Sequence, residues 1–144
     1  MADASLEKRM KVYQATALFS VLFALMGFTY NVWRMEVTER NSNVREAAFE
    51  TLLQLAELEQ LVFAAHYDQD PEGGNPRVGW VKVGLINDLS RSCSPEVAEA
   101  AVQLKSVWGR HWEPLPRERE SANAIVEAID ATRAQVQTVL TTLE

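Results

Sequence analysis

The sequence has one cysteine, Cys93, in 144 residues, so no disulfide can form within the chain. Its two histidines and its serines stand in no recognisable nucleophile and base motif, which leaves nucleophilic catalysis without support. Gly73-Gly74 is not followed by Lys-Ser or Lys-Thr, so the phosphate-binding loop of nucleotide-binding proteins is missing. We therefore expect a protein that is not an enzyme and that needs no cofactor.

Charged side chains are missing from residues 12–33, VYQATALFSVLFALMGFTYNVW. As an α-helix this run of about 22 residues measures about 33 Å, which is enough to cross the hydrocarbon core of a bilayer. A cleaved signal peptide would have a shorter apolar stretch that ends in a small-x-small site, whereas this one ends in Val32 and Trp33. A buried helix of a soluble protein would carry a polar stripe, which this run lacks. The sequence predicts an uncleaved transmembrane anchor in the lipid bilayer.

Basic residues on the two sides of the anchor predict its orientation. The preceding group is Lys8, Arg9 and Lys11 with the amino terminus, and the following group is Arg34, Arg40 and Arg45. Basic residues near the membrane favour the cytoplasmic side, and the first group is denser and closer to the apolar run. We expect residues 1–11 to be a short cytoplasmic tail and residues 34–144 to be an exported soluble domain, periplasmic or extracellular.

One face of the anchor carries small and polar residues at spacings of three and four. These residues are Ala17, Ser20, Ala24, Gly27 and Asn31. In lipid, small residues let two helix backbones approach closely, and an asparagine can hydrogen-bond across the contact. The pattern indicates packing against a second copy or another membrane protein. The alternative is that small residues are common in membrane helices in general.

The soluble domain is acidic. Residues 1–11 hold three of the 14 basic and two of the 20 acidic residues, so the rest of the chain has a net charge of −7. An acidic domain repels phosphate backbones, so we expect no nucleic-acid partner.

Four helices are predicted after the anchor, and they favour an all-α fold with an antiparallel bundle. The first begins at Asn43, which with Glu46 matches a capping box, or continues directly from the anchor, and it ends near His66. The second covers residues 77–92, where VGWVKVGLI also suits a strand but finds no second strand to pair with. The third begins at Ser94-Pro95 and ends before residues 113–116. The last follows a heptad seam from Ala122 to Leu143, as in a coiled coil or bundle.

The loop before the second helix is the first candidate site. Asp68, Asp70 and Glu72 alternate and precede Gly73-Gly74, as at the start of an EF-hand calcium loop, but Gly79 stands where the bidentate glutamate is needed. A solvated turn is the alternative, because turns favour these residue types for backbone reasons.

A second candidate site lies near the end of the third predicted helix. Trp108, His111 and Trp112 are spaced i, i+3 and i+4, so they share a face and could form an aromatic pocket for a ligand or cation. The alternative is bulky core packing at one end of the bundle.

Two functions fit these features. The first is a single-pass, membrane-anchored scaffold or interaction protein that docks a partner or self-associates through its anchor and bundle. The second is a membrane-tethered module that senses a ligand or cation and acts through a separate partner.

Overall fold

The computed structural model describes residues 2–143, with side chains from residue 6 onward except that of Lys8. This part of the chain forms four α-helices and no strand: α1 (Ala2–His66), α2 (Pro76–Ser90), α3 (Pro95–His111) and α4 (Arg119–Thr142). The all-α prediction is confirmed, and the strand alternative for residues 77–92 is not realised. Met1 and the side chain of Lys8, both in the predicted tail, lie outside the described residues. The chain divides into two units, Met1–Arg40 and Asn41–Glu144, which are described separately.

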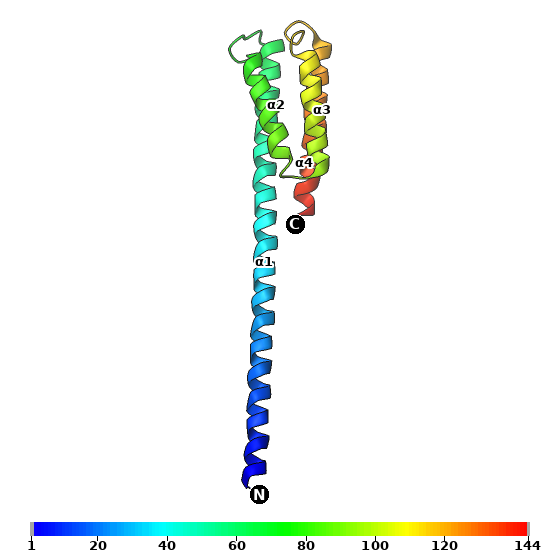
Figure 1. Ribbon diagram of the computed structural model, residues 1–144. Helices are drawn as coiled ribbons and strands as arrows, with labels where there is room; N and C mark the ends of the chain where they lie inside the picture. Colours follow the sequence, from blue (N-terminus) through cyan, green and yellow to red (C-terminus); the bar gives the residue numbers. More distant parts are fainter. Residues whose placement is uncertain (1, 144) are drawn as a thin grey trace. The chain divides into compact units, whose positions relative to one another are not determined.

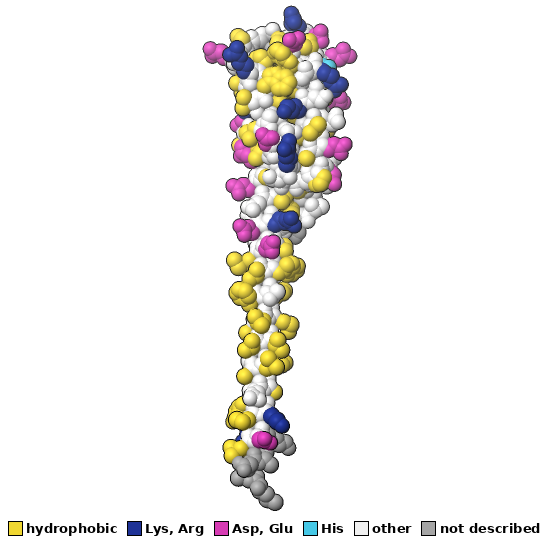
Figure 2. Space-filling view, in the orientation of Figure 1, with side chains coloured by type: hydrophobic (Ala, Val, Ile, Leu, Met, Phe, Trp, Pro, Cys, Tyr) yellow, Lys and Arg dark blue, Asp and Glu magenta, His cyan; other side chains and the backbone are white. Residues whose placement is uncertain are grey.

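The first unit is the N-terminal part of α1. Every side chain from Arg9 to Arg40 is exposed, including the whole apolar run of residues 12–33 (Figure 2). Among the described helices, α1 alone has a stretch long and apolar enough to cross a membrane, and none of that stretch is buried. A core helix of a soluble protein would be mostly buried by its own chain, whereas this segment is not.

Of the two alternatives for the first bundle helix, direct continuation from the apolar run is found, and the start at Asn43 is not, because α1 continues through Asn41, Ser42 and Asn43 without a break. These residues cost only about 0.7 kcal/mol each in a helix relative to alanine. Neither proline nor glycine occurs between Trp33 and His66, so nothing in the sequence forces the helix to end.

The second unit is an up-and-down bundle of the last part of α1 with α2, α3 and α4. Figure 1 shows the α1–α2 and α3–α4 loops at one end of this bundle and the α2–α3 connection at the other. The core is a continuous apolar cluster to which all four helices contribute, with Leu58, Ile86, Trp108 and Ile129 fully buried in it. The predicted inward faces of α3 and α4 are confirmed, since Val97, Ala101, Leu104, Ala122 and Ile125 are also buried.

α2 is a helix, as predicted, but the helical spacing of Val78, Val81, Leu85 and Leu89, which favours a helix here, does not mark its inward face. Val78, Val81 and Leu85 are exposed, whereas Gly79, Val83 and Ile86 are buried. Gly79 lies directly against the indole of Trp108, and a Cβ built on it would come within 2.1 Å of the ring carbon Cζ2. The contact between α2 and α3 therefore requires glycine at this position.

Side-chain caps begin α2 and α3 where the sequence places them. Asn75 Oδ1 accepts a hydrogen bond from the Arg77 amide at 3.0 Å. Ser94 Oγ accepts one from the Val97 amide at 3.2 Å, with Pro95 at the first helical position. Two hydrogen bonds lower the pKa of the exposed Glu96 carboxyl. The larger effect comes from the Ser94 side chain and the smaller from the backbone of Glu96 itself.

Replacing Ser94 with alanine should lower the free energy of unfolding by about 1 kcal/mol, because the Val97 amide loses its acceptor. Urea unfolding of the full chain in detergent micelles, followed by circular dichroism, measures this change. Ser92→Ala, two residues earlier in an exposed turn, is the matched control and should change stability by less than about 0.5 kcal/mol. Equal effects of the two substitutions would contradict the capping role.

Hydrogen bonds join the two loops at one end of the bundle. His66 Nδ1 lies 2.9 Å from the carbonyl oxygen of Leu115. The side-chain amide of Gln69 donates hydrogen bonds to the carbonyl oxygens of His66 at 2.6 Å and Pro116 at 2.8 Å. Gln69 adopts a positive φ of 53°, which lets its side chain turn back over the end of α1. The carbonyl oxygen of His66, the last residue of α1, thereby accepts a hydrogen bond from a side chain in place of the amide of a further helical turn.

Candidate protein-interaction surface

Large exposed hydrophobic side chains are concentrated on two helices of the second unit. Nine such side chains are described there, and α1, its end and α2 hold eight of them: Phe49, Leu53, Phe63, Tyr67, Val78, Trp80, Val81 and Leu85. Helix α3 adds Val102, and α4 adds none within residues 119–142. Exposed apolar residues scattered singly are ordinary, whereas a contiguous group of them marks an interaction surface.

The α1 part of this surface is a stripe at helical spacing. We define the α1 stripe as Phe49, Leu53, Ala56, Gln60, Phe63 and Tyr67, which alternate spacings of four and three. The opposite face of the same helical segment is buried in the core, with Leu55, Leu58 and Val62 fully covered. Phe49 is 58% exposed, Leu53 52% and Tyr67 55%, although hydrophilic side chains normally occupy the outward face of a bundle helix.

Ion pairs flank the α1 stripe on both sides. The Lys82 ammonium of α2 lies 2.5 Å from Glu57, and the Arg133 guanidinium of α4 lies 2.6 Å from Glu59. Arg133 also pairs with Asp130 one turn earlier on α4. These pairs neutralise two of the carboxylates beside the stripe, so its edges carry less negative charge than the composition of the unit suggests.

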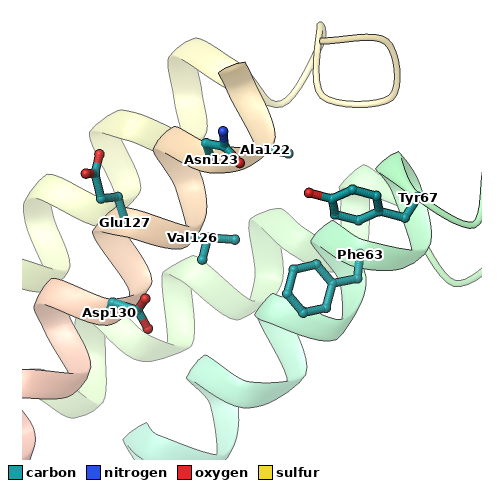
Figure 3. A pocket seen from close by; sticks show the side chains of 7 residues that line it. All are labelled: Phe63, Tyr67, Ala122, Asn123, Val126, Glu127 and Asp130. Carbon is teal, nitrogen blue, oxygen red and sulfur yellow. The ribbon is translucent and has the colours of Figure 1, made fainter. Parts of the chain in front are cut away.

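A groove of about 400 Å³ opens at the end of the stripe, between α1 and α4. Phe63 and Tyr67 line one wall, and Ala122, Asn123, Val126, Glu127 and Asp130 line the other. Figure 3 shows both rings pointing from α1 toward α4, with the Tyr67 hydroxyl directed toward Ala122. A groove of this size, open to solvent and edged by aromatic rings, suits a side chain of a partner.

The predicted acidic-loop residues do not gather into a metal centre within the described residues, where no group of three or more metal-ligating side chains occurs. Asp70 Oδ1 accepts a hydrogen bond from the Glu72 amide at 2.9 Å, and the Asp70 carbonyl oxygen accepts one from the Gly74 amide at 2.9 Å. A Cβ on Gly74 would meet the Cα of Ala65 at 2.5 Å, so the loop packs tightly on α1. Asp70 thus has a turn-forming role, while Asp68 and Glu72 are exposed. Calcium binding here stays a prediction.

The predicted aromatic site is divided between the core and the end of the bundle. Trp108 is fully buried, and its indole Nε1 has no hydrogen-bond partner among the described residues. His111 Nδ1 lies 3.1 Å from Ser121 Oγ, and the half-buried Trp112 packs against the core. Trp108 is therefore inaccessible to a ligand in this structure, and ligand binding by the trio stays a prediction.

The predicted packing face of the anchor lies in the first unit. Ala17, Ser20, Ala24, Gly27 and Asn31 are all exposed there, and a Cβ on Gly27 would meet nothing within 4 Å. The Ser20 hydroxyl donates to the Thr16 carbonyl oxygen at 2.8 Å, which satisfies it within its own helix. Helix association through this face stays a prediction.

Cys93 is half-buried and lies beside α1. Its Sγ is 4.0 Å from Thr51 Oγ1 and 3.7 Å from the Leu89 carbonyl oxygen. Burial raises the pKa of the thiol, and the Thr51 hydrogen bond opposes that change more weakly. A raised pKa keeps the sulfur protonated at neutral pH, which suits a packed residue better than a nucleophile.

Sequence reasoning missed the α1 stripe. The apolar residues of this helix, Val44, Ala48, Leu52, Leu55, Leu58, Leu61, Val62 and Ala65, recur at helical spacing and predict one inward face. Phe49, Leu53 and Phe63 fall outside that face. Their own spacing of four and ten residues is the signal that would have revealed a second apolar side.

Comparisons with protein-family models, with curated proteins and with solved structures return no match.

Proposed function

We propose that this protein is a single-pass membrane protein whose helical bundle binds a protein partner at the membrane surface. Residues 12–33 anchor the chain, with the tail on the cytoplasmic side and residues 34–144 exported. The single observation that carries the interaction role is the grouping of exposed large hydrophobic side chains on α1 and α2, while α4 exposes none in its described residues. A helix face with several large exposed apolar side chains is typical of a protein-interaction surface.

The composition of the surface is that of an interface core. Phe49, Phe63, Tyr67 and Trp80 are exposed aromatic side chains, and aromatic residues supply most of the binding energy at protein interfaces. Fully burying one large apolar side chain contributes about 1.5–3 kcal/mol, so a few of them suffice for micromolar binding after the cost of association. Membrane anchoring adds to this, because it confines the chain and its partner to one surface.

Affinity purification of the full chain from detergent extract tests the proposal. Leu53→Glu places a charge in the α1 stripe, and Ala134→Glu places the same charge on the exposed side of α4 as the matched control. A partner, or a differently tagged second copy, should be recovered with the wild-type chain and with Ala134→Glu and be lost with Leu53→Glu. Recovery of no partner by any of the three, or equal recovery by all, would refute a role for this surface.

The alternative, a ligand-sensing or cation-sensing module, draws on one observation, the groove between Phe63, Tyr67 and α4. Its carboxylates, Glu127 and Asp130, stand opposite two aromatic rings, which is an arrangement that attracts cations. Asp130 is already paired with Arg133, so the groove offers less free charge than its composition implies. The interaction role therefore remains the first proposal.

A further inference from the structure

We propose that the α1 stripe binds the α1 stripe of a second copy of this chain, in a parallel and in-register pair. This inference rests on the proposed function, because it names the partner and the contact surface of the membrane-bound interaction module. Four observations carry it: the period of the stripe, the charges beside it, its one polar residue and the anchor.

The stripe has the period of a coiled-coil seam. Its spacings of 4, 3, 4, 3 and 4 residues place Phe49, Ala56 and Phe63 at d positions and Leu53, Gln60 and Tyr67 at a positions. Such a seam is self-complementary, since a two-fold axis parallel to the helix brings each a or d residue against its own copy. The opposite face of the same segment is already buried in the core of the bundle, so only the outward seam is available to a separate chain.

Charges next to the stripe favour the parallel arrangement. Arg45 occupies a g position and Glu50 the following e position, and in a parallel coiled coil these two positions lie opposite each other on different helices. The pair would form Arg45–Glu50 contacts between copies, once on each side of the seam. At the next two such pairings Leu52 meets Glu57 and Glu59 meets Ala64. Glu46, the a position before Phe49, would meet its own copy beside the Arg45–Glu50 contacts.

The antiparallel arrangement lacks this complementarity. When the two stripes run in opposite directions about their centre, Glu57 lies opposite Glu57 and Glu59 opposite Glu59. These carboxylates are already paired with Lys82 and Arg133, so they distinguish the two directions only weakly. Arg45 then faces residues beyond the end of α1 and loses Glu50. The Arg45–Glu50 contacts, which form only in the parallel arrangement, therefore favour the parallel pair.

Gln60 and the anchor favour the in-register alignment of the two α1 stripes. Gln60 is the one polar residue in the stripe, and two facing amides can hydrogen-bond only when the copies are in register, as a single polar a position does in coiled coils. Chains inserted in one membrane with the same orientation are held together at high local concentration. Weak self-affinity in solution is sufficient under that confinement.

Disulfide crosslinking in native membranes tests the pairing. In full chains carrying Cys93→Ala, new cysteines are introduced singly as Ala56→Cys and Leu53→Cys on the stripe and as Ala134→Cys on α4. Facing a or d cysteines come close enough for a disulfide, whereas those on α4 do not. We expect the two stripe variants to form about tenfold more covalent dimer than Ala134→Cys, a difference that corresponds to 1.4 kcal/mol. Adding Leu53→Glu to Ala56→Cys should remove that excess.

The other outcomes separate this inference from the proposed function. If Ala56→Cys stays monomeric while the chain remains in the membrane and retains a partner, the second copy is wrong and the interaction role stands. Crosslinking of Ala56→Cys to a different protein has the same meaning. Equal dimer from Ala134→Cys would show random collision and overturn the pairing. Release of the chain from washed membranes would overturn both proposals.

Discussion

Replacing Gly79 with alanine should destabilise the bundle by about 3 kcal/mol, the upper part of the range for overpacked cores. The added Cβ would lie 2.1 Å from Cζ2 and 2.3 Å from Cη2 of Trp108. Trp108 is fully buried and surrounded by core residues, so its ring cannot move aside without disturbing α3. Urea unfolding of the full chain in detergent micelles, followed by circular dichroism, measures the loss.

Gly84, five residues further along α2, is the matched control. A Cβ there meets nothing within 4 Å, and the residue is inside the helix. Gly84→Ala should therefore stabilise the protein by about 0.5–1 kcal/mol, because alanine loses less backbone entropy in a helix. The two substitutions are chemically identical and should act with opposite signs. If both stabilise the bundle, the close contact between α2 and α3 is not present in solution.

The second large effect is expected at Trp108 itself. Trp108→Ala should cost about 4 kcal/mol, because it removes the largest fully buried side chain and leaves a cavity in the core. Its Nε1 has no partner among the described residues, so loss of a hydrogen bond does not add to this cost.

Trp108→Phe tests the close contact between Gly79 and the Trp108 indole separately from the packing of the core. Phenylalanine lacks the part of the indole that touches Gly79, so Gly79→Ala should be much less harmful in the Trp108→Phe background than in the wild type. A double-mutant cycle by urea unfolding gives the interaction energy, which we expect to be about 1–3 kcal/mol in favour of the double variant. Additive effects would mean that the two residues do not touch.

The faces of α3 and α4 could be predicted from the sequence because their apolar residues follow one helical stripe with polar residues elsewhere. Val97, Ala101, Leu104 and Trp108 illustrate this, and all four are buried. In α2 the same reasoning found the helix but not its orientation. VGWVKVGLI is apolar nearly all round, so periodicity cannot say which side meets the core. The orientation is set by the fit of Gly79 against Trp108, a contact between residues 29 apart in sequence that no local pattern contains.

The candidate surface was predictable only in part. An interaction role was expected from the anchor and bundle, whereas the α1 stripe became visible once the structure separated buried from exposed apolar residues on one helix. Leu55 and Leu53 have the same chemistry and differ in exposure by 52 percentage points, since Leu55 is 0% and Leu53 52% exposed. The difference arises from which neighbours cover each residue, and that depends on α2 and α4 rather than on α1 alone.

The proposed function depends most on the anchor, and carbonate extraction of membranes that contain the full chain tests the anchor directly. High pH strips peripheral proteins but leaves a helix with about 20 apolar residues in the bilayer. We predict that the wild-type chain stays in the membrane pellet. A double variant with Leu22→Lys and Leu25→Lys should leave it, because each lysine at the centre of a span costs about 2.5–3.5 kcal/mol. Recovery of the wild-type chain in the soluble wash would contradict the anchor and, with it, the place assigned to the bundle.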